Sequence, residues 1–217
     1  MLLTEKQNHG LTQFVRAALS RRPAVSISEI IGLPVVLEVS GVSLHPLSKL
    51  ATEYHSFLPT DVATVHQVFS GSMSGDALLL LDDRHALMFA NWLRKKNKNP
   101  GLPLSYLNVS DCEILTEIGN IVLNSYLSML TNLNSGKIFF SVPYFQIKPL
   151  KNLVDSLIVS KNEIRYVIVI NTTFRLPDNF VDGYLVLVSS VVSLSCLIRA
   201  IEESWSEVGY EYAGIKN

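Results

Sequence analysis

The chain has 217 residues, of which 48% are hydrophobic and 17% are charged, and its formal net charge is −1. This length suffices for one substantial core or for two fused copies of a smaller unit. A chain without excess positive charge lacks the electrostatic field that holds nucleic acid or an anionic membrane surface, so neither class of partner is expected. Cys112 and Cys196 lie far apart among apolar residues, which predicts two buried free thiols in a reducing compartment.

The chain shows no export signal, and its most apolar stretch is a poor candidate for a membrane span. That stretch, residues 181–200, contains Asp182, Gly183 and four serines. A membrane-spanning helix needs about 20 predominantly apolar residues. We therefore predict a buried strand followed by a helix here, and a cytoplasmic protein.

The first half of the chain is predicted to contain a helix, three strands and a closing helix. The first helix ends near Gly32, and a short connector that begins at Pro46 separates the first strand from the next two. Alternating and β-branched residues predict the strands, and a helical period predicts the closing helix. The three strands and the closing helix span residues 34–39, 64–70, 75–81 and 83–96.

The second half repeats this order of elements. A helix over about residues 110–131 precedes a strand over residues 137–142, and a short connector then begins at Pro149. Two further strands and a last helix follow, over residues 164–174, 183–188 and 191–206. Repetition of one supersecondary unit within a chain indicates that the two copies build a common core.

Duplicated α+β halves of this kind usually join their sheets around a pseudo-twofold axis and cover one sheet face with helices. We predict one α+β domain over residues 1–217, built from two repeats of about residues 10–96 and 105–206. The basic, turn-rich run from Arg94 to Gly101 lies between the repeats and is predicted to be a solvated linker.

The first helix of the second half carries the most informative polar residues. It is predicted to begin at Ser110, with Glu113 completing a capping box. Glu113, Glu117, Asn120 and Asn124 follow at spacings of four, three and four residues, so their side chains share one face of the helix. Such a face can be a binding surface or the solvent-exposed side of an amphipathic helix, and the spacing alone leaves both interpretations open.

The residues that surround this face resemble a known signature. Glu117 and Asn120 form a Glu-x-x-Asn motif, and 22 residues separate Asn120 from Pro143. This pattern resembles the CheC/CheX/FliY family of chemotaxis phosphatases, in which an Asp or Ser precedes the Glu, Asn and Pro. Glu113 stands at that first position, where it departs from the family. The resemblance extends to residues 71–75 and 181–184.

The resemblance implies a CheC-like fold and a hydrolase that removes the aspartyl phosphate of a CheY-like receiver domain in chemotaxis or two-component signalling. By resemblance, Glu117 would pair with the active-site lysine of the receiver. Asn120 would orient the attacking water through its amide oxygen or nitrogen, and Glu113 and Asn124 would contact the partner beside them. No cofactor or metal is expected on this chain, whereas Mg²⁺ is expected on the phosphorylated receiver.

The first repeat is predicted to lack such a site. Where the second repeat has Glu117 and Asn120, the aligned residues of the first repeat are Ala17 and Ser20. A methyl group forms no ion pair, and a hydroxyl is shorter than a carboxamide and differs from it in hydrogen bonding. We therefore expect one site in each chain.

Two further features are predicted to be structural. Pro143 fixes φ and removes a donor from the sheet ladder, so it should mark an edge or a bend of its strand, and its counterpart in the first repeat is Ser40. The segment Gly71–Gly75 lacks the Gly-Lys-Ser/Thr ending of a phosphate-binding loop and lies between two strands. A hairpin turn is expected there.

A second hypothesis belongs to a different class of function. The same helix could serve a non-catalytic adaptor that binds a receiver domain, a CheD-like deamidase or a flagellar-switch component. The departures at Glu113 and in the first repeat favour this alternative. The chain ends soon after its last predicted helix, so no separate surface-presentation domain is expected, which argues against the switch role.

Overall fold

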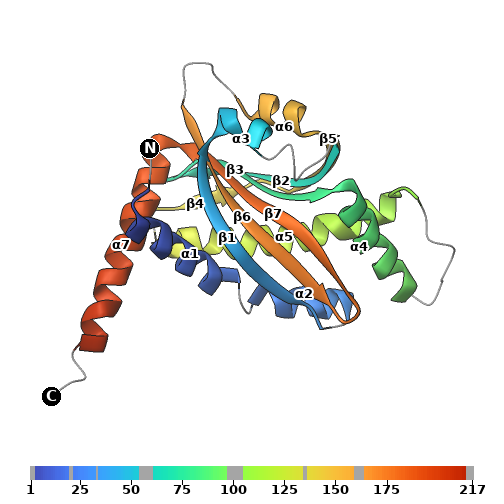
Figure 1. Cartoon of the computed structure of the whole chain (residues 1–217), viewed down its shortest axis with the longest axis horizontal. Helices are drawn as coiled ribbons and strands as arrows, with labels where there is room; N and C mark the ends of the chain where they lie inside the picture. The colour runs from blue at the N-terminus through green and yellow to red at the C-terminus, as the bar shows by residue number, and fades with distance from the viewer. Residues whose placement is uncertain are drawn as a thin grey trace.

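The computed structural model describes residues 3–19, 22–32, 34–53, 61–96, 105–133, 136–158 and 164–213. Its strands form one antiparallel sheet in the order β1-β6-β7-β3-β2-β4, with β5 also paired to β2 (Figure 1). The strands are β1 (Val36–Pro46), β2 (Asp61–Gly71), β3 (Gly75–Asp82), β4 (Ile138–Phe140), β5 (Tyr144–Pro149), β6 (Arg165–Leu176) and β7 (Asn179–Ser190). The helices are α1 (Glu5–Leu19), α2 (Arg22–Ile31), α3 (Leu47–Glu53), α4 (Asp83–Lys96), α5 (Val109–Leu133), α6 (Leu150–Leu157) and α7 (Val191–Ala213).

The sheet is built by exchange between the two halves. The first strand of each half pairs with the second strand of the other, as β1 with β6 and β5 with β2. The third strands, β3 and β7, pair with each other at the centre. This pairing relates the halves by a pseudo-twofold axis between β3 and β7, and it confirms the predicted α+β fold with duplicated halves.

Helices lie on both faces of the sheet. One face is covered by α1, α2, α4, α5 and α7, which enclose the larger apolar core, and the other face is covered by α3 and α6 (Figure 1). The prediction that helices cover only one face was therefore wrong. The short connectors after Pro46 and Pro149 are helices, because each carries leucines at helical spacing, such as Leu47 and Leu50 or Leu150 and Leu153, that are buried against the sheet.

The edge strand of each half contains a bulge at a corresponding place. In β1 the register with β6 slips between Val39 and Gly41, so Ser40 is the extra residue. In the second half, Phe140 pairs with Phe69 and Tyr144 with His66, so four residues on the edge match three on β2. The single strand predicted over residues 137–142 is therefore wrong. It divides into β4 and β5, and Pro143 lies in the break.

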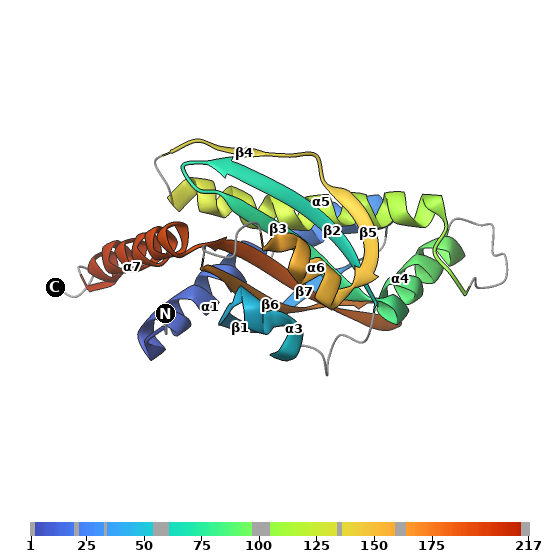
Figure 2. The same ribbon diagram turned by 90° about the horizontal axis from the view of Figure 1, so that it is seen from above.

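The last helix is longer than predicted. It begins at Val191 as expected, but it continues to Ala213, and its C-terminal part extends away from the sheet (Figures 1 and 2). Among the described residues, none of the helices combines the length and the apolarity needed to cross a bilayer.

Helix α5 lies very close to β2 at Gly119. A Cβ atom at Gly119 would lie 2.6 Å from Cβ of Val65 and 2.7 Å from each of its methyl groups. A β-branched side chain in a packed sheet has no freedom to withdraw from such a contact. The helix can therefore reach this depth only with glycine at position 119.

Replacing Gly119 by alanine should destabilise the fold. The gain in helix propensity is about 1 kcal/mol, but the overpacking against Val65 is expected to outweigh it and to lower the free energy of unfolding by about 1–3 kcal/mol. Urea denaturation of Gly119→Ala measures this change.

Gly10→Ala is the matched control, because Gly10 is also helical but its added Cβ would lie 3.7 Å from Ile201, an ordinary contact. This control should be neutral or stabilising. A stabilised Gly119→Ala variant would contradict the close packing of α5 on β2.

Candidate functional site

The start of α5 is capped two residues earlier than the sequence pattern indicates. The backbone nitrogen of Asp111 donates to Oδ1 of Asn108 at 3.0 Å, and the backbone nitrogen of Asn108 donates to Oδ2 of Asp111 at 2.7 Å. This reciprocal pair is a capping box. The predicted box of Ser110 and Glu113 is therefore wrong, and Ser110 lies inside the helix. Glu113 is thus not needed for capping.

Asp111 also ties α5 to α4. Its side chain is 4% exposed and forms an ion pair with Arg94, whose Nε lies 2.8 Å from Oδ1. Arg94 also donates to Oδ1 of Asn91 at 2.7 Å. The prediction that the basic run beginning at Arg94 is only a solvated linker is therefore wrong for Arg94, which positions the first turn of α5. Residues 97–101 of that run lie outside the described residues.

The four predicted site residues lie on one face of α5. Glu113 and Glu117 are exposed, whereas Asn120 and Asn124 are half-buried. The opposite face is buried and consists of Leu115, Ile118, Val122, Leu123, Tyr126 and Leu127. The two carboxylates therefore face solvent in the N-terminal part of this surface. The two carboxamides are less exposed and lie closer to the edge of the sheet.

The two carboxamides are joined to each other and to β2. Nδ2 of Asn124 donates to Oδ1 of Asn120 at 2.7 Å. Nε2 of Gln67 donates both to Oδ1 of Asn124 at 3.2 Å and to the backbone carbonyl of Ser141 at 2.9 Å. Gln67 is 2% exposed, so a buried residue of the sheet supports the partly exposed amides of the helix.

The bulge beside Pro143 forms the neighbouring wall of the site. The backbone nitrogen of Ser141 donates to the carbonyl of Val68 at 2.9 Å, and the backbone nitrogen of Val68 donates to Oγ of Ser141 at 3.0 Å. The break in the strand leaves the backbone nitrogen of Val68 without a carbonyl partner in the sheet ladder. The hydroxyl of Ser141 accepts its hydrogen bond instead. The carbonyl of Ser141 is free to accept from Gln67.

The described residues of the first half form no equivalent of the polar face of α5. Its counterpart of α5 consists of two helices, α1 and α2, and Ala17 lies on the exposed side near the end of α1. Ser20, the predicted counterpart of Asn120, lies outside the described residues. No carboxylate occupies the position of Glu117 in this half.

A second polar cluster lies on the opposite face of the sheet. Nε2 of His66 lies 2.9 Å from Oδ1 of Asp76, Nη2 of Arg165 lies 2.9 Å from Oδ2 of Asp76, and the hydroxyl of Tyr144 lies 2.6 Å from Nδ1 of His66. Burial disfavours the charged form of Asp76, but the hydrogen bond from His66 and the charge of Arg165 outweigh it and lower the pKa of Asp76. Burial, together with the charge of Asp76, raises the pKa of Tyr144.

Sequence reasoning missed Gln67 and misplaced the cysteines. Gln67 and its neighbour His66 interrupt an apolar strand, and that interruption was the available signal of buried polar partners. Cys196 is exposed, because it lies on the outer side of α7 between the buried Leu194 and Leu197. Cys112 is half-buried, and burial raises the pKa of its thiol. The prediction of two buried thiols was therefore wrong.

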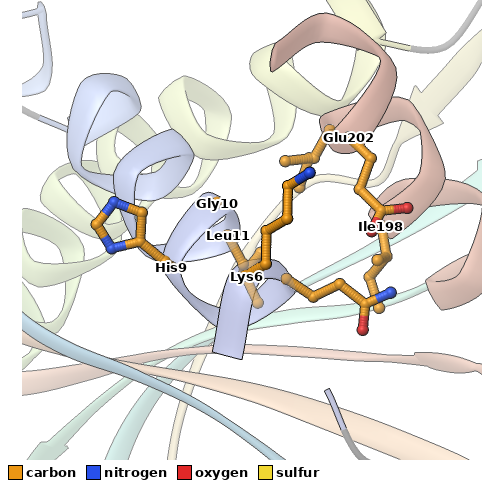
Figure 3. A pocket seen from close by; sticks show the side chains of 8 residues that line it. Lys6, His9, Gly10, Leu11, Ile198 and Glu202 are labelled. Carbon is orange, nitrogen blue, oxygen red and sulfur yellow. The ribbon is translucent and has the colours of Figure 1, made fainter. Parts of the chain in front are cut away.

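A cavity of about 310 Å³ lies between α1 and α7. Residues of the two helices face one another across it, with Leu11 and Ile198 among the apolar ones and Lys6 and Glu202 among the charged ones (Figure 3). None of its lining residues belongs to α5. The cavity is therefore separate from the polar face of α5.

No family model and no curated protein matches this chain. Solved structures do match it over nearly its whole length. FliY from Thermotoga maritima superimposes with a TM-score of 0.72 at 17% sequence identity, covering 94% of this chain and 99% of the other. The chain has the fold of FliY.

Structures of FliM share the same fold. The FliM middle domain from H. pylori matches with a TM-score of 0.60 at 14% identity, covering 91% of this chain and 99% of that one. A chain from a FliG–FliM complex from H. pylori matches with a TM-score of 0.61 at 14% identity, covering 91% and 100%. The resemblance that the motif around Glu117 and Asn120 predicts is thus confirmed at the level of the fold.

Replacing Asp76 by asparagine should destabilise the protein in a pH-dependent way. At neutral pH the variant leaves Arg165 buried without its carboxylate, so the free energy of unfolding should fall by about 3–5 kcal/mol. The pKa of Asp76 is lowered from its ordinary value of 3.8, so its contribution is present above that pH and is lost as the pH falls below it.

Urea denaturation at several pH values tests this prediction. The difference between the wild type and Asp76→Asn should shrink as the wild-type carboxylate becomes protonated. Asp155→Asn is the control, because Asp155 forms an exposed pair with Lys151, which is worth no more than about 1 kcal/mol. A difference between Asp76→Asn and the wild type that stays constant down to the most acidic pH would contradict the role of the charged carboxylate.

Proposed function

We propose that this protein is a phosphatase that hydrolyses the aspartyl phosphate of a CheY-like receiver domain, with α5 as the helix that enters the partner's site. One observation carries the proposal. Glu117 is exposed, and Asn120, one turn further along the same face, is partly exposed, so both side chains can be reached by another protein. The fold shared with FliY and the motif spacing to Pro143 support the same assignment.

Glu117 is proposed to dock the partner. Its carboxylate stands on the exposed side of α5, and Glu113 lies one turn before it on the same face. A lysine beside the phosphorylated aspartate of the receiver is the complementary group, and an ion pair with it would set the register of the helix. Glu113 would add a second negative charge that attracts basic residues at the rim of the partner.

Asn120 is proposed to act on the reacting atoms. Phosphoryl transfer passes through a loose transition state, so catalysis consists mainly of positioning the water and stabilising charge. A neutral carboxamide can hydrogen-bond to water or to a phosphoryl oxygen without repelling the anion. The phosphoryl group and the Mg²⁺ would both belong to the receiver, and this chain would contribute Asn120 and the docking face.

A second candidate function is a non-catalytic adaptor in a chemotaxis or flagellar assembly. The observation that favours it is the fold shared with FliM, which has been crystallised in a complex with FliG. Under this alternative, the exposed face of α5 binds a receiver domain, a CheD-like deamidase or a switch component without accelerating hydrolysis. The two functions differ in whether Asn120 affects the rate of phosphate release.

Asn120→Ala should abolish most of the phosphatase activity. Removing one positioned hydrogen-bonding group from a phosphoryl-transfer site should lower kcat by about 10²–10³ and leave KM nearly unchanged. Release of phosphate from a phosphorylated receiver, with this protein in catalytic amounts, measures the effect.

Asn152→Ala is the matched control, because Asn152 is an exposed helical asparagine on α6, across the sheet from α5. It should retain full activity. Wild-type turnover by Asn120→Ala would refute the catalytic proposal, and binding of the receiver without any acceleration by the wild type would establish the adaptor instead.

Glu117→Lys should weaken binding of the receiver more than it slows hydrolysis. Reversing the charge places two cations together, so KM for the phosphorylated receiver should rise at least about tenfold, which corresponds to about 1.4 kcal/mol. Steady-state kinetics and a binding titration against the receiver measure this change. Asp155→Lys reverses a charge on α6 and should leave KM unchanged. An equal effect of the two reversals would remove Glu117 from the interface.

A further inference from the structure

The orientation of the Asn120 carboxamide is set from inside the protein. A carboxamide has a donor end and an acceptor end of nearly the same shape, so its direction is determined by its hydrogen-bond partners. Three carboxamides are connected in series here: Gln67 on β2 and then Asn124 and Asn120 on α5. The direction of the first amide therefore determines the direction of the other two.

The backbone carbonyl of Ser141 fixes the first amide. A carbonyl oxygen can only accept, so the end of Gln67 that lies 2.9 Å from it must be the nitrogen, Nε2. The second proton of this nitrogen points to Asn124, at a distance of 3.2 Å. Ser141 itself is held by its two hydrogen bonds to Val68, so this acceptor does not move away.

The remaining amides follow from this donor. Asn124 must turn its oxygen toward Gln67, so its nitrogen faces Asn120 and donates to Oδ1 at 2.7 Å. The oxygen of Asn120 is therefore already occupied. Among the described residues, Nδ2 of Asn120 makes no hydrogen bond, so the two N–H groups of this nitrogen are available to a partner.

The burial of Gln67 shows that this arrangement costs stability. Gln67 is 2% exposed, and its Oε1 is buried without a partner among the described residues. An unsatisfied buried acceptor costs about 1–3 kcal/mol, which an apolar residue at this position would avoid. The amide oxygen of Gln67 has no partner, but its nitrogen donates to two acceptors. Such a buried glutamine is suited to positioning another side chain.

We propose that Gln67 is a positioning residue that acts through Asn124 to make Asn120 a hydrogen-bond donor toward the partner. This inference rests on the proposed function and makes it more specific. Nδ2 of Asn120 donates to an oxygen in the partner's site, either that of the attacking water or a phosphoryl oxygen, and the amide oxygen takes no part. A donor at this place stabilises negative charge that develops on oxygen during hydrolysis.

The orientation can be measured in the free protein by nuclear magnetic resonance. Side-chain amide protons of asparagine give resolved signals, and Asn120→Asp and Asn124→Asp assign them. One Nδ2 proton of Asn124 should be protected from exchange with solvent, and both Nδ2 protons of Asn120 should exchange freely. The reverse pattern in the wild type would overturn the inference, whatever the activity of the protein.

Gln67→Glu should reverse the direction of the hydrogen bonds that connect the three side chains. Burial raises the pKa of a carboxyl group, so the new side chain would be protonated, and the oxygen that replaces Nε2 would donate its proton to Ser141 and accept a hydrogen bond from Asn124. Asn124 would then present its nitrogen to Glu at position 67 and its oxygen to Asn120, and Asn120 would present Oδ1 outward. Asn120 should accordingly gain a protected Nδ2 proton, whereas Asn124 should keep one, now bonded to the side chain at position 67. Unchanged protection of both side chains would overturn the role of Gln67.

Kinetics on a phosphorylated receiver separate positioning from folding. Gln67→Glu should lower kcat by about 10² with KM unchanged, because an acceptor replaces the donor. Gln67→Met removes the first amide and leaves the other two without a fixed direction, which should lower kcat by about tenfold. Gln146→Met is the matched control, because Gln146 also has one buried amide atom without a partner among the described residues, in its case Nε2, and it lies on β5 facing away from α5.

The proposed function and this inference fail in different ways. A wild type that shows the expected amide protection but does not accelerate phosphate release refutes the phosphatase and leaves the outward donor in place. A wild type that accelerates release, with Gln67→Glu reaching the same kcat, supports the phosphatase and overturns the positioning role. Equal loss of kcat in Gln67→Met and Gln146→Met would also overturn it, because the loss would then reflect general destabilisation.

Discussion

The arrangement of the candidate site depends on the contact between Gly119 and Val65, where α5 reaches the sheet without an intervening side chain. Because the backbone of the helix lies so close to β2, the next residue on the outer side, Asn120, remains near the edge of the sheet. Asn124 is also brought within 3.2 Å of Gln67, a residue that is almost fully buried. A helix held further out by a methyl group would lose this connection. One close approach therefore sets both the packing of the core and the position of the amides.

Duplication supplied the scaffold, and divergence confined the site to one half. Both edge strands carry a bulge at corresponding positions, around Ser40 and around Pro143. On β6 the buried Thr172 has a shorter side chain, which donates to the carbonyl of Gly183 within the sheet. It makes no connection to a helix above it. The exchanged strands thus preserve the fold in both halves, while Gln67 on β2 adds a hydrogen bond from the sheet to α5.

Most of the fold followed from local sequence patterns, because alternating strands and amphipathic helices are local properties. The closing helix of the first half was predicted with the bounds that α4 has, and the polar face from Glu113 to Asn124 was found by its spacing. The features that were missed depend on distant partners. The pattern at Ser110 permits a capping box, but Asn108 and Asp111 form it, and Arg94 from another helix secures it. The direction of the Asn120 amide depends on a carbonyl in a different strand, which no local pattern encodes.

Two consecutive residues of β2 explain why the wall of the site is well fixed. Side chains of neighbouring residues in a strand point to opposite faces of the sheet. His66 accordingly contacts the hydroxyl of Tyr144 on the face covered by α3 and α6, while Gln67 contacts the carbonyl of Ser141 on the face covered by α5. The bulged segment from Ser141 to Tyr144 is thus held from both faces. A loop fixed from one face could turn its carbonyl away, but a segment fixed from both keeps the acceptor on which the direction of all three amides depends.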